Sequence, residues 1–199
     1  MRKRSLHAYR RRRLRLRDGR CVTLRAAVEA DAAELVQAFA RLSPQARYQR
    51  YMRGKTAPDL EALHRDVRPL AGEEFTFVAT VPAADGIDIV ASARIVRSAS
   101  NAGHARAICE FAITVGDDWR AVGLGRALLA ALLRRARYLG YRSIEGFVLA
   151  ANAPMLGCAR RLGFAVAPLA GEPSIRRVWR ALRPARRARA SVSARRPAP

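Results

Sequence analysis

Two glycines, Gly123 and Gly125, lie two residues apart immediately before a long apolar segment. Glycine lets a loop expose consecutive backbone N–H groups, and a helix that begins at such a loop directs the positive end of its dipole toward a bound anion. Arg120 and Arg126 flank the glycines, and their guanidinium groups could add charge-assisted hydrogen bonds to phosphate oxygens. The spacing therefore suits a pyrophosphate, although two glycines alone are also compatible with a tightly packed helix start.

Two familiar phosphate-binding loops do not fit this stretch. A Walker loop needs a lysine followed by serine or threonine, and neither follows Gly125. A dinucleotide-binding loop needs a third small residue where this chain has Leu128. Glu145 stands twenty residues beyond Gly125, where a ribose-binding acid would be expected. It falls in the middle of a predicted strand, so we do not assign it that role.

Length and composition indicate one globular domain. The chain has 199 residues, of which 50% are hydrophobic, enough to bury a sizeable core. Its longest apolar runs, such as residues 127–133, are far too short to cross a bilayer, and no apolar segment follows the basic N-terminus. We therefore expect a cytoplasmic protein. Cys21, Cys109 and Cys158 lie far apart and are odd in number, which predicts buried thiols rather than a disulfide framework or a metal site.

The net charge of +22 is concentrated at the two ends of the chain. Residues 1–20 contain ten Lys or Arg and one acid, and residues 176–199 contain nine and no acid. The remainder carries 19 basic and 15 acidic side chains, a net charge of only +4. Blocks of like charge usually stay solvated, so we expect residues 1–19 and 183–199 to be disordered tails around a domain at 20–182. Such tails are either passive or make weak, salt-dependent contacts with nucleic acid.

Hydrophobic periodicity predicts alternating strands and helices along the domain. Asp31, Ser43 and Asn152 are the predicted helix N-caps, and Gly140 is the predicted end of the third helix. Strands are expected at 20–28, 73–81, 85–96, 105–115, 141–150 and 174–182, and helices at 29–42, from Ser43, at 124–139 and at 152–162.

The order of these elements predicts the fold class. The helix at 124–139 must return the chain between two parallel strands, whereas three successive strands between residues 73 and 115 predict an antiparallel meander. The expected fold is therefore α/β, with a mixed, mostly antiparallel central sheet flanked by helices. One face of the third helix is expected to contain Leu124, Leu128, Ala131, Leu132 and Tyr138.

A wider pattern surrounds the two glycines. Residues 120–125 match R/Q-x-x-G-x-G/A, between a predicted strand and a predicted helix. With this pattern the chain resembles the GNAT superfamily of acetyl-CoA-dependent N-acetyltransferases, without a gap from 109 to 164 and over most of 21–182. Residues 40–52 are similar to the acceptor-side helix of the bacterial Pat-type protein lysine acetyltransferases. The resemblance implies the GNAT fold and an acetyltransferase.

The same resemblance implies where acetyl-CoA binds. Backbone N–H groups from Val122 to Arg126 would bind the pyrophosphate, with Arg120 at the start of the loop. The pantetheine arm would lie beside the strand at 105–115 and meet backbone groups there. Asn152 would approach the same arm, cap its own helix, or do both. The residues implied for the cofactor are Ile113, Val115, Arg120, Val122, Gly123, Leu124, Gly125, Arg126 and Asn152, and no metal is implied.

Acetylation of an amine needs a base, because a primary amine with a pKa of about 10.4 is mostly protonated at neutral pH. The resemblance assigns this role to Glu110, which matches a strand glutamate of the Pat-type enzymes. Strand alternation puts Glu110 on one face with Ala112 and Thr114. Burial in so apolar a strand would raise the pKa of Glu110 toward that of a useful base. A salt-bridged structural glutamate is the alternative.

The chain departs from the resemblance at the general acid. Many members have a tyrosine seven residues after the helix-opening asparagine, where this chain has Ala159. Coenzyme A thiolate is itself a tolerable leaving group, since a free thiol has a pKa of about 8.5. We therefore expect direct transfer within a ternary complex. An acyl-enzyme intermediate on Cys158 is disfavoured, because an apolar helix favours the neutral thiol.

The acceptor side is the part that the sequence defines least. Analogy with the family points to Phe39, Tyr48 and Tyr51, whose helical spacing fits core packing equally well. Asp117 and Asp118 either attract a cationic amine or are solvated loop acids. The expected activity is acetyl transfer from acetyl-CoA to a primary amine, with a protein lysine or a small molecule as acceptor. The alternative is a basic nucleic-acid- or ribosome-associated module that binds acyl-CoA without efficient catalysis.

Overall fold

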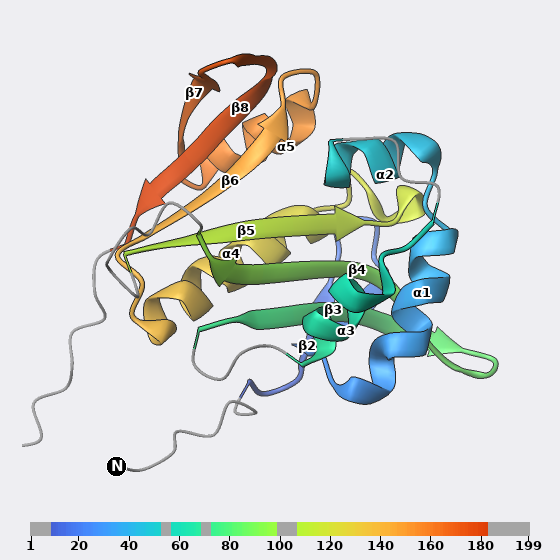
Figure 1. Cartoon of the computed structure of the whole chain (residues 1–199). Coiled ribbons are helices and arrows are strands. Elements are labelled where there is room, and N and C mark those ends of the chain that lie inside the picture. The colour runs from blue at the N-terminus through green and yellow to red at the C-terminus, as the bar shows by residue number, and fades with distance from the viewer. Residues whose placement is uncertain (1–8, 53–56, 69–72, 99–106, 183–199) are drawn as a thin grey trace, which may run out of the picture.

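A single eight-stranded sheet organises the computed structural model, which describes residues 9–52, 57–68, 73–98 and 107–182 (Figure 1). The strands are β1 (Arg12–Arg15), β2 (Cys21–Ala26), β3 (Phe75–Ala83), β4 (Gly86–Arg97), β5 (Ile108–Val115), β6 (Ser143–Leu149), β7 (Ala165–Leu169) and β8 (Glu172–Ala181). The helices are α1 (Ala32–Ala40), α2 (Pro44–Tyr51), α3 (Leu60–Val67), α4 (Leu124–Leu139) and α5 (Ala153–Arg161), with short 3-10 turns η1 (Glu29–Asp31) and η2 (Asp117–Trp119).

The sheet has mixed strand directions, as predicted. Its order is β1-β2-β3-β4-β5-β6-β8-β7. The neighbours from β1 to β5 are antiparallel, β5 and β6 are parallel, and β8 is antiparallel to both β6 and β7. The parallel pair requires a crossover, and α4 supplies it. The predicted meander and the predicted role of this helix are both confirmed.

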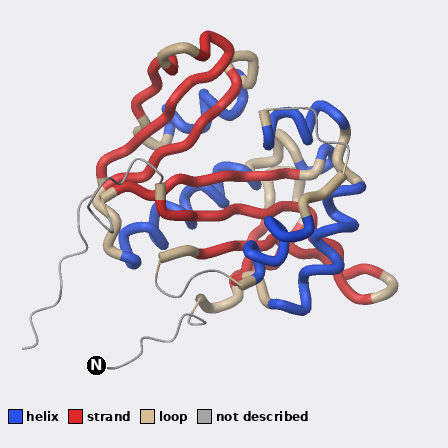
Figure 2. Tube along the Cα trace, viewed as in Figure 1, coloured by secondary structure: helices blue, strands red, loops and turns tan. Residues whose placement is uncertain are grey.

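Helices cover both faces of the sheet (Figure 2). On one face α4 packs on β4 and β5 and also contacts α5, which lies against β7. On the other face α1 packs on β4, α2 on β5 and α3 on β3. This arrangement leaves β5 in the centre of the molecule, with α2 and the beginning of α4 near its C-terminal end. Within the described residues, no helix is both long and apolar enough to span a membrane.

The predicted inner face of α4 is correct except at its last turn. Leu124, Leu128, Ala131 and Leu132 have no exposed surface, and each buried leucine contributes about 1.5–3 kcal/mol of hydrophobic free energy. Tyr138 is 51% exposed, so its predicted place on this face is wrong. The guanidinium of the buried Arg135 lies 4.1 Å from the centre of the Phe75 ring and 4.8 Å from that of Tyr138. Arg135 thus takes the inner position, and the phenol lies outside it.

Two of the three predicted helix caps are confirmed. Ser43 Oγ accepts a hydrogen bond from the N–H of Ala46 at 3.1 Å, and Asn152 Oδ1 accepts one from the N–H of Met155 at 3.2 Å. Asp31 does not cap α1. Its buried carboxylate instead accepts two hydrogen bonds of 2.6 Å from Arg25. Asp31 Oδ2 also accepts a hydrogen bond from the N–H of Val28 at 2.8 Å, so the carboxylate binds Arg25 and the residue before η1 rather than an N–H of α1.

The predicted N-terminal tail contains ordered structure. Residues 12–15 form β1, which pairs with β2 from Arg12↔Leu24 to Arg15↔Cys21, so the expected disorder of residues 1–19 is wrong for this part. Charged side chains are common on edge strands, where they face water, and this explains how an arginine run can be a strand. β7 and α3 were also not predicted. Residues 1–8 and 183–199 lie outside the described residues, and their disorder remains a prediction.

Candidate active site

β5 and β6 separate part of the way along the sheet (Figure 2). Their pairing covers only Ile108–Glu110 and Ser143–Glu145, and the strands diverge beyond that point. The ring of Phe111 lies against the backbone of Gly146, where an added Cβ would come within 2.7 Å of the ring. The Phe111 ring also makes an edge contact with Phe164, with centroids 5.6 Å apart. An aromatic side chain therefore packs at the point where strand pairing stops.

The diverging part of β5 presents backbone groups to the gap. In the β4–β5 ladder the N–H of Ser98 donates to the carbonyl of Ile108 at 3.2 Å, and the N–H of Gly116 donates to that of Val90 at 2.9 Å. Hydrogen-bonded pairs recur at every second residue of an antiparallel ladder, so the even-numbered residues of β5 bond to β4. The backbone groups that face away from β4 are those of Phe111, Ile113 and Val115. An extended ligand could pair with this edge as an added strand would.

The loop before α4 contains backbone donors without helical partners. Gly123 has a φ of 94° and Ala121 a φ of 60°, so both are in the left-handed region. The N–H of Ala127 donates to the carbonyl of Gly123 at 3.1 Å and begins the helical series. The N–H groups that precede it lie at the positive end of the helix dipole and can hold an anion. They belong to Leu124, Gly125 and Arg126.

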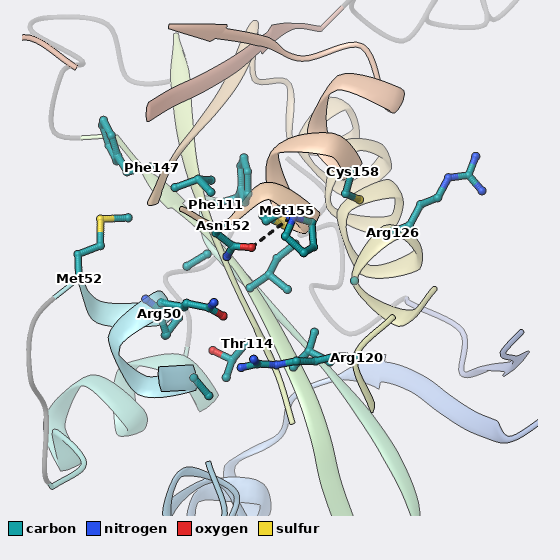
Figure 3. Close-up of a pocket in the computed structure, with 18 of the residues that line it drawn as sticks. Arg50, Met52, Phe111, Thr114, Arg120, Arg126, Phe147, Asn152, Met155 and Cys158 are labelled. Atoms are coloured by element: carbon teal, nitrogen blue, oxygen red, sulfur yellow. Dashed lines mark hydrogen bonds between the residues drawn. The ribbon is translucent and has the colours of Figure 1, made fainter. Parts of the chain in front are cut away.

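The strand edge and this loop border one cavity of about 730 Å³ (Figure 3). A cavity of this size can hold a large part of a cofactor. The side chains of Val122 and Leu124 pack in the hydrophobic core instead, which leaves their backbone groups as the parts that could bind a ligand. The other predicted site residues all line the cavity: Glu110, Ile113, Val115, Arg120, Gly123, Gly125, Arg126 and Asn152.

Arg17 also lines this cavity, and the sequence reasoning missed it. It follows β1 in the segment predicted to be a tail. Its N–H donates to the carbonyl of Val122 at 3.1 Å, and its Nε lies 3.6 Å from where a Cβ on Gly123 would be. The alternation of Leu14 and Leu16 with arginines has the period of a strand and could have revealed this element. A cationic side chain is thus placed beside the loop that precedes α4.

Glu110 lies at the point where the two strands separate, half-buried and paired in register with Glu145. Burial and the neighbouring Glu145 carboxylate raise the pKa of Glu110, and the positive charge of Arg50 opposes them. Glu145 is 2% exposed, accepts from Ser98 Oγ at 2.6 Å and forms an ion pair with Arg177 at 2.7 Å. Within the described residues, Glu110 has no ion pair. The salt-bridged structural glutamate is therefore Glu145, whereas Glu110 faces the cavity.

α5 contributes three residues of different character. Asn152 caps the helix and lines the cavity, so the two roles considered for it are compatible. Cys158 lines the cavity as well, and burial raises the pKa of its thiol, which favours the neutral form. Ala159 is completely buried in the core and offers no acidic group. The helix therefore supplies neither a thiolate nor a phenol at these positions.

A second cavity of about 220 Å³ lies beside the first, between α1, α2 and the ends of β4 and β5. Phe39, Tyr51, Asp117 and Asp118 line it, which brings four of the five proposed acceptor-side residues together. Tyr48 is 47% exposed and lines neither cavity. Phe39 and Tyr51 also stack in the core, with ring centroids 5.9 Å apart. The residues that line both cavities are Arg50, Tyr51, Thr114 and Trp119.

Asp117 connects the elements around the second cavity. Its carboxylate accepts hydrogen bonds from the N–H of Ser43 at 2.9 Å and from Ser43 Oγ at 2.8 Å. It also forms an ion pair with Arg120 at 3.3 Å. These contacts join the start of α2 to η2 and to the loop before α4. Among the residues described, no group of three or more His, Cys, Asp and Glu side chains is arranged to hold a metal ion.

Comparison with known proteins gives a family and a set of relatives. The family model described as acetyltransferase (GNAT) domain matches residues 22–165. Acetyltransferase PA5475 of Pseudomonas aeruginosa is 30% identical over 150 residues, which are 75% of this chain and 77% of that protein. Acetyltransferase Pat of Mycolicibacterium smegmatis is 39% identical over 75 residues, or 38% of this chain. That match spans only 21% of the length of Pat.

Solved structures share the fold. The GNAT domain of S. lividans PAT superposes with a TM-score of 0.76 at 24% identity, covering 86% of this chain and 97% of that domain. A phosphinothricin acetyltransferase from Sinorhizobium meliloti, solved in complex with AcCoA, has a TM-score of 0.64 at 21% identity, covering 81% of this chain and 88% of that one. At these identities the likeness shows the fold alone.

Proposed function

Because this chain belongs to the GNAT acetyltransferase family, we propose that it transfers an acetyl group from acetyl-CoA directly to a primary amine. One observation carries the proposal. A single cavity joins the helix N-terminus at Gly123, the unpaired backbone edge of β5 and the half-buried carboxylate of Glu110. A site for phosphate, a strand edge for an extended arm and a candidate base would then lie along one path.

The cofactor would occupy the side of the cavity that α4 forms. Its pyrophosphate would accept hydrogen bonds from the N–H groups of Val122 to Arg126, with Arg17 and Arg120 adding positive charge. The pantetheine amides would pair with backbone groups of Ile113 and Val115, in the manner of an added strand. Asn152 would approach the same arm from α5. This orientation brings the thioester toward Glu110.

An acceptor ammonium loses two protons on the way to an amide, one before it attacks the thioester and one as the amide forms. Glu110 would take a proton from the ammonium, and the raised pKa of this carboxyl brings the base closer to neutral pH. The amine nitrogen would then attack the thioester carbonyl, forming the amide C–N bond as the C–S bond breaks. The coenzyme A thiolate leaves and takes up a proton. Burial raises the pKa of the Cys158 thiol and so disfavours its thiolate, which argues for direct transfer rather than an acyl-enzyme.

A protein lysine and a small amine are both candidates for the acceptor. The similarity of residues 40–52 to Pat-type enzymes supports a lysine, and the partial match to Pat adds to it. The alternative of a nucleic-acid-associated module rests on the two arginine-rich ends, of which residues 1–8 and 183–199 are outside the described part. No contact of the described domain favours that alternative, and the chain between the ends carries a net charge of only +4.

The proposal is tested by measuring coenzyme A release from acetyl-CoA against a panel of amines, amino acids and lysine peptides. We expect acceptor-dependent release for at least one class, and its loss in the Glu110→Gln variant. Failure of every acceptor, together with tight RNA binding at physiological salt that requires residues 183–199, would replace the enzyme with the nucleic-acid-associated module. Protein without residues 183–199 serves as the control for that binding.

A further inference from the structure

Arg50 is a cavity cation that the proposed acetyl-CoA site does not use. It lies in the last turn of α2 and lines both the main and the second cavity. Figure 3 shows it on the α2 side, across the cavity from Arg126 and Cys158. Arg17, Arg120 and Arg126, by contrast, lie around the loop that begins α4. Arg50 therefore faces the place where an acceptor, rather than the cofactor phosphates, would enter.

The charge of Arg50 is not neutralised by an acidic side chain. No carboxylate of the described residues lies within 4 Å of its guanidinium, which is half-buried and stacks over the Tyr51 ring at 4.9 Å. Of the other acids that line the second cavity, Asp117 binds Ser43 and Arg120, Asp88 lies 3.6 Å from Arg41, and Asp118 forms no ion pair with Arg50. A stacked, partly desolvated guanidinium is suited to a bidentate contact with a carboxylate ligand.

Glu110 and Arg50 carry opposite charges on one cavity. The positive charge of Arg50 acts on the Glu110 carboxyl, yet the two groups do not form a salt bridge. Part of the cavity therefore separates the Glu110 carboxylate from the Arg50 guanidinium. A zwitterion complements this arrangement, with its ammonium toward Glu110 and its carboxylate toward Arg50. A lysine within a protein carries only the ammonium, and Arg50 would repel it.

We propose that the acceptor is a free amino acid, whose carboxylate binds Arg50 while its amine faces Glu110. This proposal rests on the proposed acetyl transfer and names its substrate class. The second cavity, which shares Arg50 and Tyr51 with the first, would take the side chain of the amino acid. Its buried wall includes Leu35, Phe39 and Ile89, so a medium-sized apolar side chain fits it best. Arg50 is then a specificity-determining residue for the acceptor.

The experiment compares L-leucine, L-methionine and L-phenylalanine with their carboxamides and with a lysine peptide, as acceptors for wild-type protein and for Arg50→Met. We expect wild-type kcat/KM to favour the free acid over its amide by about tenfold or more, since a charge-assisted hydrogen bond contributes about 1.5–3 kcal/mol. Arg50→Met should lose this preference while its acetyl-CoA Kd stays the same, and Arg50→Lys should restore part of it. Arg134→Met, exposed on α4 and outside both cavities, is the control and should keep the preference.

Two results would overturn the amino acid proposal. One is turnover of the amides or the lysine peptide equal to or faster than that of the acids. The other is an equal loss for acids and amides in Arg50→Met. Calorimetric titration of the same acids and amides in the presence of coenzyme A separates this proposal from the enzyme itself. If the acids bind through their carboxylate and need Arg50, but no coenzyme A is released from acetyl-CoA, the amino acid site is supported and the transferase is rejected. If the acids do not bind but acetyl is transferred to peptides, the transferase is supported and the amino acid site is rejected.

Discussion

The two walls of the main cavity are built in different ways. The wall at the start of α4 presents the backbone N–H groups that follow Gly123, with Arg17, Arg120 and Arg126 around them. The wall at α2 consists of side chains, among them Arg50 and Tyr51, that reach the cavity only because α2 packs on β5. A binding wall made of backbone has a local glycine signature, whereas a wall made of side chains depends on which helix the fold places beside it.

The contrast also separates the two halves of the reaction. Backbone donors recognise a phosphate whatever group is attached to it, so the α4 wall suits a common cofactor. The α2 wall offers a charge and an aromatic ring, which can discriminate among acceptors. Glu110 lies between the two walls. Substitutions on one wall should therefore change cofactor affinity, and those on the other should change acceptor turnover or preference.

The largest effect is expected at Glu110, which lies between the two walls. Glu110→Gln keeps the shape of the side chain but removes the base, so kcat should fall by about 10²–10⁴-fold. The acetyl-CoA Kd should not change, because no cofactor contact is assigned to this carboxylate. Steady-state coenzyme A release and calorimetry measure the two quantities, with Glu172→Gln at the exposed start of β8 as control. Full turnover by Glu110→Gln would remove Glu110 as the base.

Gly123→Val tests the backbone wall alone. Gly123 has a φ of 94°, which a β-branched residue adopts only with strain of about 1–3 kcal/mol, so the loop should rearrange and the acetyl-CoA Kd should rise about 10–100-fold. Gly171→Val is the matched control, since Gly171 has a φ of 78° in the β7–β8 turn and does not itself line the cavity. Both variants should lose stability to denaturant. Equal Kd values for the two would contradict the assignment of the pyrophosphate loop.

The Arg17→Met variant tests whether the β1–β2 hairpin contributes to cofactor binding at the start of α4. Loss of one charge-assisted contact should weaken acetyl-CoA binding about tenfold and reduce its dependence on salt. Arg13→Met, on the exposed part of β1, is the control and should bind as the wild type does. Calorimetry at two ionic strengths provides the measurement. If the two variants behave alike, Arg17 packs against the loop without binding the cofactor.

The smallest effect is a shift in pH dependence. The negative charge of Glu145 raises the pKa of Glu110, so Glu145→Gln should lower that pKa and move the acidic limb of the kcat/KM profile to lower pH. Arg50→Met removes a positive charge and should move the same limb to higher pH. Arg177, which pairs with Glu145 in the wild type, remains charged in both variants. If the acidic limb of the kcat/KM profile does not move in either variant, a group other than Glu110 titrates there.

Local patterns predicted the central elements of the fold well. The period of α4 and the conformation required at Gly140 located that helix to the residue, and the side-chain chemistry of Ser43 and Asn152 located two N-caps. The residues implied for the cofactor and the base also gather at one cavity. The helix bounds and the caps depend on hydrogen bonds within a few residues, so a single segment of sequence contains them. The cavity residues come from several segments, and the family resemblance pointed to them.

The errors share a different cause. The arginines of β1 predict a charged tail because they resemble a solvated block, and only pairing with β2 makes them a strand. Asp31 is predicted to cap α1, but its carboxylate binds Arg25, which lies on β2 rather than on the helix. Arg135 occupies the inner position predicted for Tyr138. Each outcome was decided by a partner outside the local pattern.

The amino acid sequence was enough to predict the central strands and helices, and with the family resemblance it pointed to a phosphate-binding loop at Gly123 and to Glu110 as the candidate base. Only the tertiary structure shows that β5 and β6 diverge and that Arg17 lies beside the loop before α4. It also shows that Arg50 lies across the cavity from the start of α4. The physical reason is the range of the interactions. Backbone geometry and periodicity act between near neighbours in the chain, whereas the charges that would select an acceptor act across a space that exists only after α2 packs on β5.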